Sequence, residues 1–237
     1  MRDGDNEDLP EASQPPEADP WTLRYYDRGT QGFERVILFS DAVYAIALTL
    51  IAATLVAPTL TSMTNGQDAG TAIADGLGNI WPYALTFMWI AFYWKANHRF
   101  TLTLRRMDSR YIWAILTYLA FVALLPFPAS VLGESASLTA LAFFIGYMAC
   151  ISALEVVLML IAIRDDLLVR PLTTVEKRNA VLSALSPVVA SLIAVPACFI
   201  PGMNFYVALA IYVVLSIALG VIVRRVYAVP GWSRTRH

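Results

Sequence analysis

Six long runs of apolar residues, separated by short polar segments, dominate the pattern along the chain. They cover Val36–Ala57, Leu77–Ala96, Tyr111–Val131, Leu138–Ile163, Val181–Ile200 and Phe205–Val226. The hydrocarbon core of a bilayer is about 30 Å thick, and roughly 20 helical residues cross it. Apolar residues are continuous within each run rather than alternating, which excludes the strands of a membrane β-barrel. The pattern therefore predicts an all-α integral membrane protein with six transmembrane helices packed as one bundle.

Prolines mark two of these runs. Pro126 and Pro128 stand near the end of the third run, where we expect a kink or an early helix end. Pro187 and Pro196 interrupt the fifth run, where neighbouring groups or water must satisfy the backbone groups that lose a partner. Ordinary helix kinks explain these positions most simply, because proline is frequent in transmembrane helices.

All 17 lysines and arginines fall on one side of the six-helix arrangement. They stand before the first run, between the second and third, between the fourth and fifth, and after the sixth. The other three connections contain none. Because basic residues concentrate in cytoplasmic loops, this distribution predicts that both termini lie in the cytoplasm.

The composition fits a chain whose surface faces lipid, since 58% of its residues are hydrophobic, 15% are charged and the mean hydropathy is +0.59. The beginning of the chain differs, with seven acids and four prolines in its first 20 residues. Such a segment cannot bury enough apolar surface to fold. We therefore expect a disordered acidic cytoplasmic tail at 1–30, a transmembrane channel domain at 31–228 and a short cytoplasmic tail at 229–237.

Cysteine and histidine are too few to suggest a metal centre. Cys150 and Cys198 lie inside apolar runs and are interpreted as small core residues. His98 and His237 are the only histidines, so a haem or zinc site is hard to build. We expect no cofactor and no enzyme activity.

Polar groups inside the apolar runs are unfavourable in a membrane and therefore mark candidate functional positions. Asp41 lies roughly 7 to 8 Å inside the first helix, so its side chain should face protein rather than lipid. The second run ends on the same side of the membrane with Trp94 and His98, within possible reach of Asp41, Ser40 and Arg35. A structural hydrogen-bond cluster without catalysis is the simplest interpretation of these residues.

A second acid, Glu155, stands near the middle of the fourth run, one turn after Ser152. An acid at this depth is normally protonated or paired with a neighbour. A proton-relay or ion-site role and a neutral packing role both remain open, and the packing role is the simpler one.

The first run has two faces on a helical wheel. At 100° per residue, one face carries an apolar stripe that Thr49 interrupts at mid-membrane depth. This stripe consists of Phe39, Ala42, Ile46, Thr49, Leu50 and Ala53. Ser40 and Asp41 point about 120–140° away from Ile46. The stripe suits the lining of a pore, but a lipid-facing or packing surface has the same pattern.

Motifs in the first three runs resemble those of a known family. They are Arg35-x-x-x-Phe39-Ser40-Asp41 with the Ala-Val-Tyr-Ala-Ile-Ala-Leu-Thr-Leu segment that follows, Trp94-x-x-x-His98, and Leu124-Leu125-Pro126-Phe127-Pro128. Together they resemble the transmembrane protein 175 family, which comprises the endolysosomal potassium channel and its prokaryotic relatives. The Phe-Ser-Asp motif occurs once, so the chain is similar to the single-repeat prokaryotic branch, whose members assemble as homotetramers. The topology resembles the family over roughly residues 30–226.

The resemblance implies that the first helix of each subunit lines a central pore. Ile46 matches the isoleucine or leucine at the family's narrowest constriction, and Thr49 matches a threonine layer implicated in selectivity. Leu50 lies on the same face. Ala53 departs from the larger aliphatic residue common at its position, which implies a wider outer constriction. The residues that match the polar network holding this helix in place are Arg35, Phe39, Ser40, Asp41, Trp94 and His98.

The function expected from these features is a potassium channel of the plasma membrane. The chain lacks a Thr-Val-Gly-Tyr-Gly filter. A ring of Ile46 side chains would instead form a hydrophobic constriction, and Thr49 hydroxyls would supply a modest preference for potassium. The alternative is a proton- or ion-coupled secondary transporter that uses Asp41 and Glu155. The expected partners are further copies of the chain, membrane lipids and permeant potassium ions, with no nucleic acid.

Overall fold

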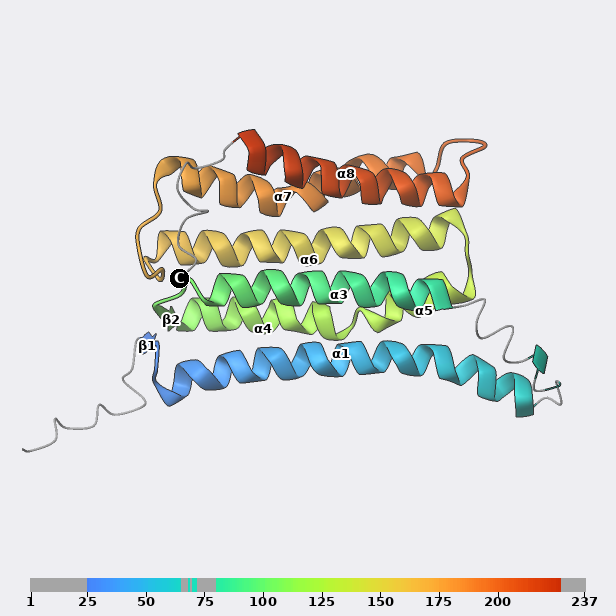
Figure 1. Cartoon of the computed structure of the whole chain (residues 1–237), viewed down its shortest axis with the longest axis horizontal. Coiled ribbons are helices and arrows are strands. Elements are labelled where there is room, and N and C mark those ends of the chain that lie inside the picture. The colour runs from blue at the N-terminus through green and yellow to red at the C-terminus, as the bar shows by residue number, and fades with distance from the viewer. Residues whose placement is uncertain (1–24, 65–67, 69, 72–79, 227–237) are drawn as a thin grey trace, which may run out of the picture.

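The computed structural model describes residues 25–64, 68, 70–71 and 80–226, which form a bundle of long helices (Figure 1). The named helices are α1 (Gln31–Thr64), α3 (Ile80–Thr101), α4 (Ser109–Ala123), α5 (Pro126–Glu134), α6 (Leu138–Arg164), α7 (Thr174–Ala197) and α8 (Phe205–Val226). Two short strands, β1 (Tyr25–Asp27) and β2 (Arg106–Asp108), accompany them. The predicted all-helical architecture is confirmed.

Five helical spans among the described residues are long and apolar enough to cross a membrane. They are Gln31–Ala53, Ser109–Glu134, Leu138–Arg164, Thr174–Ala197 and Phe205–Val223. The second predicted run corresponds to α3, which is not among them because its tryptophans, tyrosines and Lys95 lower its hydropathy. The expected start of that run, Leu77, lies outside the described residues. Six crossings and the orientation of the termini therefore stay predictions.

Hydrogen bonds at one end of the bundle join three segments that are far apart in the sequence. Strand β1 pairs antiparallel with β2, with Tyr26 opposite Met107. Leu104 forms an isolated bridge with Leu168, and the Arg28 guanidinium donates to the Leu102 carbonyl at 2.8 Å. We call residues 25–28, 102–108 and 167–169 the basal clasp. It brings the chain before α1, the α3–α4 connection and the α6–α7 connection to the same end, so successive helices alternate in direction (Figure 1).

The basal clasp corrects one predicted boundary. The acidic tail was expected to extend to residue 30, whereas Tyr25–Asp27 is a strand held by backbone hydrogen bonds to β2. The Arg106 guanidinium also stacks 4.2 Å from the centre of the Tyr25 ring. Both contacts stabilise an ordered conformation that composition alone does not predict. The rest of the predicted tail, residues 1–24, and the C-terminal residues 227–237 lie outside the described residues.

The prolines act differently in the two runs. The predicted early helix end is confirmed, because α4 stops at Ala123 and α5 begins at Pro126. In α7, by contrast, Pro187 lies inside a continuous helix. Pro187 has no N–H to donate to the Ser183 carbonyl, and the Ser186 hydroxyl donates to that carbonyl instead, at 2.8 Å. The Ser186 side chain thus satisfies the carbonyl that Pro187 leaves without its usual partner in the helix.

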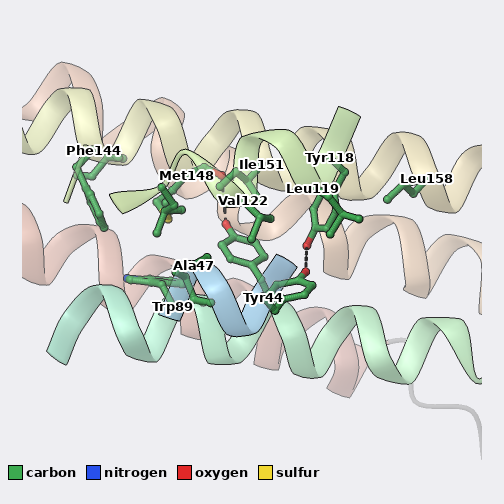
Figure 2. Close-up of a cluster of buried hydrophobic side chains, with 14 of the residues drawn as sticks. Tyr44, Ala47, Trp89, Tyr118, Leu119, Val122, Phe144, Met148, Ile151 and Leu158 are labelled. Carbon is green, nitrogen blue, oxygen red and sulfur yellow. Dashed lines mark hydrogen bonds between the residues drawn. The ribbon is translucent and has the colours of Figure 1, made fainter. Parts of the chain in front are cut away.

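Helix packing places α1 on one flank of the bundle and the α7–α8 pair on the other (Figure 1). Helix α1 contacts α3, α4 and α5, and α7 packs between α6 and α8. Figure 2 shows part of the core between them, where Tyr44, Tyr118 and Met148 are fully buried. The described residues cover only one side of α1 and leave its other side exposed.

Candidate functional site

The inner face of α1 is packed against the rest of the subunit. Ser40, Tyr44, Ala47 and Ile51 recur at the spacing of one helical face, and each is at most 1% exposed. Phe33 continues the same face at the start of the helix and is also fully buried. These residues determine which side of α1 points away from the subunit.

The outer face of α1 carries the predicted stripe. The side chains of Phe39, Ile46 and Leu50 are 51%, 56% and 47% exposed. The smaller members, Ala42, Thr49 and Ala53, are exposed as well. None of the described residues covers this stripe, and it runs along the outer flank of the bundle. The geometry makes the stripe available to a pore or to lipid, so its pore-lining role stays a prediction at this point.

Thr49 has a defined hydroxyl orientation on this outer face. Its Oγ1 donates a hydrogen bond to the Ile46 carbonyl one turn earlier, at 2.8 Å. A hydroxyl whose proton is engaged in this way still has lone pairs to offer as an acceptor. Thr49 therefore presents an oxygen acceptor, rather than a donor, toward the space outside the subunit.

The polar residues at the basal end of α1 contact α3. The Trp94 indole N–H donates to the Asp41 carboxylate at 2.9 Å. The Trp94 and His98 rings stack with their centroids 5.4 Å apart and an interplanar angle of 20°. Asp41, Trp94 and His98 thus form one connected group that ties α1 to α3.

The other residues of the expected polar network, Ser40, Arg35 and Phe39, are placed differently. The Ser40 hydroxyl is buried but donates to the Val36 carbonyl of its own helix at 2.9 Å. Arg35 and Phe39 are exposed. Among the described residues, no hydrogen bond or ion pair connects Arg35 to Asp41. The structure of one subunit thus brings together Asp41, Trp94 and His98 but leaves Arg35 and Phe39 outside that group.

Glu155 and Asp41 lie on different helices and in different surroundings. Glu155 is half-buried on α6, whereas Asp41 is held by the Trp94 indole on α3. The described residues contain no group of three or more histidines, cysteines or acids that could hold a metal ion.

Two buried hydroxyl pairs were missed by the sequence analysis. The Tyr44 and Tyr118 hydroxyls are 2.6 Å apart and join α1 to α4 (Figure 2). The Tyr93 and Ser152 hydroxyls are 2.7 Å apart and join α3 to α6. Each tyrosine sits in an apolar run where its aromatic ring alone explains its presence. A tyrosine on the inner face of a helix indicates that its hydroxyl needs a buried hydrogen-bond partner. Which residue supplies that partner depends on the tertiary packing and is not visible in the sequence.

The antiparallel helices and the free outer face of α1 define the chain as an all-α membrane protein with the fold of a known channel. A crystal structure of a lysosomal potassium-selective channel TMEM175 homolog from Chamaesiphon minutus is similar to it, with a TM-score of 0.62 and 22% sequence identity. The match covers 82% of this chain and 99% of that chain.

A family model identifies the sequence relationship more closely. Residues 35–126 match the model of the endosomal/lysosomal potassium channel TMEM175. The family resemblance inferred from the motifs is therefore confirmed, and the bacterial homolog is consistent with the prokaryotic branch. The matched segment includes the stripe of α1 and the Asp41–Trp94–His98 group. A search of curated proteins finds no match to the chain.

Proposed function

We propose that the chain is a potassium-selective cation channel in which four copies place α1 around a central pore. The observation that supports this most directly is the outer face of α1, whose stripe is exposed in the single subunit. One helix cannot enclose a pore, so symmetric copies of α1 must surround it. The family match over this same helix adds independent support.

The proposed constriction is a ring of four Ile46 side chains. Ile46 is 56% exposed and lies about 15 residues into α1, roughly 22 Å from its start. Because α1 begins just after the basal clasp, this position is close to mid-membrane in the proposal. A ring of branched aliphatic side chains has no charge to stabilise an ion and closes a narrow pore by excluding water. Ile46 therefore sets the conductance in this proposal.

Selectivity in this proposal comes from Thr49, which follows Ile46 by almost one helical turn. The hydroxyl proton is committed to the Ile46 carbonyl, so the oxygen faces the pore as an acceptor. Four such oxygens replace only part of the hydration shell of a cation. The preference for potassium over sodium is therefore weaker than in channels built on rings of backbone carbonyls.

A secondary transporter using Asp41 and Glu155 is less well supported. Asp41 is bonded to Trp94 in a structural contact. Transporters of that kind commonly have broken helices at matching positions in two halves of the chain. Here α4 and α5 are separated by a break, whereas α7 continues through Pro187. The channel match also favours conduction over coupled transport.

The proposed setting is the plasma membrane, with lipid around the α7–α8 flank and copies of the chain around α1. The large apolar side chains of α8, such as Val214 and Ile217, are 62% and 61% exposed, as expected for a surface in contact with lipid. In this arrangement each subunit turns one flank to the pore and the opposite flank to the bilayer.

The experiment that tests the proposal is single-channel recording of the purified protein in planar bilayers with opposed potassium and sodium solutions. Unitary currents that reverse near the potassium equilibrium potential are expected. Electroneutral or gradient-coupled uptake into vesicles without unitary currents would overturn the channel assignment. Light scattering of the same preparation in detergent measures the number of subunits, and a conducting monomer would overturn the proposed assembly.

A further inference from the structure

The tyrosine pair, Tyr44 and Tyr118, occupies the interface between α1 and α4. Both side chains are fully buried, at 1% and 0% exposure, and their hydroxyls are 2.6 Å apart (Figure 2). Leu119 and Val122 of α4 are also buried, and Glu155 of α6 is an acid that interacts electrostatically with both tyrosines. Separating the two hydroxyls in such surroundings is unfavourable, because each loses the hydrogen-bond partner that the described residues give it.

The position of Tyr44 relates this bond to the proposed pore. Tyr44 precedes Ile46 by two residues, which places the two side chains about 200° apart around the helix axis. Tyr44 faces the interior of the subunit, and Ile46 faces away from it. The contact that holds one face of α1 therefore also sets the direction of the opposite face.

From this geometry we propose that the tyrosine pair is a positioning element that fixes the rotation of α1 and so aims Ile46 at the pore axis. The inference rests on the proposed function. Tyr44 and Tyr118 do not touch the permeant ion and act through the orientation of α1 alone.

The magnitude of the effect follows from helix geometry. Side-chain atoms lie about 5 Å from the helix axis, so a rotation of about 20° moves them by about 2 Å. That displacement lengthens a 2.6 Å hydroxyl contact well beyond hydrogen-bond range. The same rotation moves each Ile46 side chain by about 2 Å. That shift is a large fraction of the width of a pore that is narrow enough to exclude water.

Apolar packing alone restrains this rotation less strongly. The inner face of α1 near Tyr44 also includes Ala47 and Ser40, which are small. Small side chains form a smooth surface that tolerates small rotations of one helix against another. The Asp41–Trp94 bond provides a second attachment, but Trp94 is 40% exposed, whereas the tyrosine pair is fully buried at a deeper level of the helix.

The test compares Tyr44→Phe, Tyr118→Phe and the double variant. Each single change leaves one buried hydroxyl without a partner, so it lowers both stability and the fraction of assembled protein. The double change removes both hydroxyls, so stability returns toward that of the unmodified protein while the restraint on rotation remains absent. We expect the assembled double variant to differ by about twofold or more in unitary conductance and to show a changed potassium-to-sodium permeability ratio.

A matched control is available in the second hydroxyl pair. Tyr93 and Ser152 are also buried, at 5% and 0% exposure, with hydroxyls 2.7 Å apart. They join α3 to α6, neither of which carries the stripe. The Tyr93→Phe/Ser152→Ala variant removes a bond of the same kind, together with the bond from the Tyr93 hydroxyl to the Met148 carbonyl at 3.2 Å. It should lower stability while leaving unitary conductance and the permeability ratio unchanged.

The measurements are unitary conductance and permeability ratio in planar bilayers, together with thermal unfolding and subunit number in detergent. A double tyrosine variant that assembles and conducts as the unmodified protein does overturns the inference and leaves only a role in stability. An equal change of conductance in the Tyr93 control also overturns it. Absence of potassium current from the unmodified protein has a different meaning, because that result overturns the proposed function itself.

Discussion

The hydrogen bond between Asp41 and Trp94 gives the prediction that the structure defines most fully. Replacing Asp41 by Ala removes the acceptor 2.9 Å from the Trp94 indole nitrogen and leaves that N–H without its partner. A hydrogen bond to a charged group stabilises a fold by about 1.5–3 kcal/mol. Because Trp94 is 40% exposed, solvent replaces part of the lost hydrogen bond to its indole N–H. We therefore expect a loss of stability near the lower end of this range, about 1.5 kcal/mol. About 1.5 kcal/mol corresponds to roughly a tenfold change in an equilibrium constant.

The assay is a double-mutant cycle of Asp41→Ala, Trp94→Phe and the combined variant, measured by thermal unfolding and by the assembled fraction in detergent. Because both single variants lose the same bond, the combined variant should be less destabilised than the sum of the two, by about 1.5 kcal/mol. Glu34→Ala is a matched control, since Glu34 is an exposed acid in the first turn of the same helix. It should leave stability and assembly nearly unchanged.

The prediction also has a functional component. Asp41 lies on the inner side of α1 and not on the stripe, so the Asp41→Ala channels that do assemble should retain the ion preference of the unmodified protein. Fully assembled and stable Asp41→Ala channels with an altered preference among alkali cations would refute this reasoning. They would show that Asp41 contacts the permeant ion rather than holding α1 in place.

Three further predictions concern the pore and the topology. Ile46→Asn should raise unitary conductance and relax selectivity, because a polar ring no longer excludes water, and an unchanged current would contradict a pore lined by α1. Thr49→Val is nearly isosteric but lacks the hydroxyl, so it should mainly lower the potassium-to-sodium permeability ratio, and an unchanged ratio would argue against Thr49 as a ligand. In a background without the two native cysteines, Thr71→Cys should react with an impermeant thiol reagent added outside and Arg170→Cys should not, whereas the opposite pattern would reverse the proposed orientation.

The helices and their order could be predicted from the sequence because membrane burial requires long continuous apolar runs. Proline chemistry predicted the end of α4, where Pro126 begins a new helix. The sequence also predicted that one helix continues through Pro187 with neighbouring groups satisfying the freed backbone, but it did not identify the Ser186 hydroxyl as the group that reaches the Ser183 carbonyl. The residues of the stripe were correctly assigned to one face, because a helical wheel needs only the spacing of residues.

Contacts between distant segments were the part that sequence patterns could not supply. The strands β1 and β2 are each only three residues long, too short for an alternating pattern to identify them. Ser40 was expected within reach of Trp94 and His98, but its hydroxyl is satisfied within its own helix by the Val36 carbonyl. Likewise, nothing in the sequence indicates that Tyr44 meets Tyr118 rather than another tyrosine.

The basal clasp has a consequence for how the protein is made. The ribosome synthesises Tyr25 well before Arg106. Strand β1 can therefore pair with β2 only after the intervening helices have entered the membrane and brought the chain back to the same side. If the first hairpin inserts with one crossing missing, β1 and β2 emerge on opposite sides of the bilayer and cannot pair. The bridge from Leu104 to Leu168 imposes the same condition on the next pair of crossings. With the six crossings proposed above, a few backbone hydrogen bonds at one end of the bundle would distinguish correctly threaded chains from misthreaded ones during biogenesis.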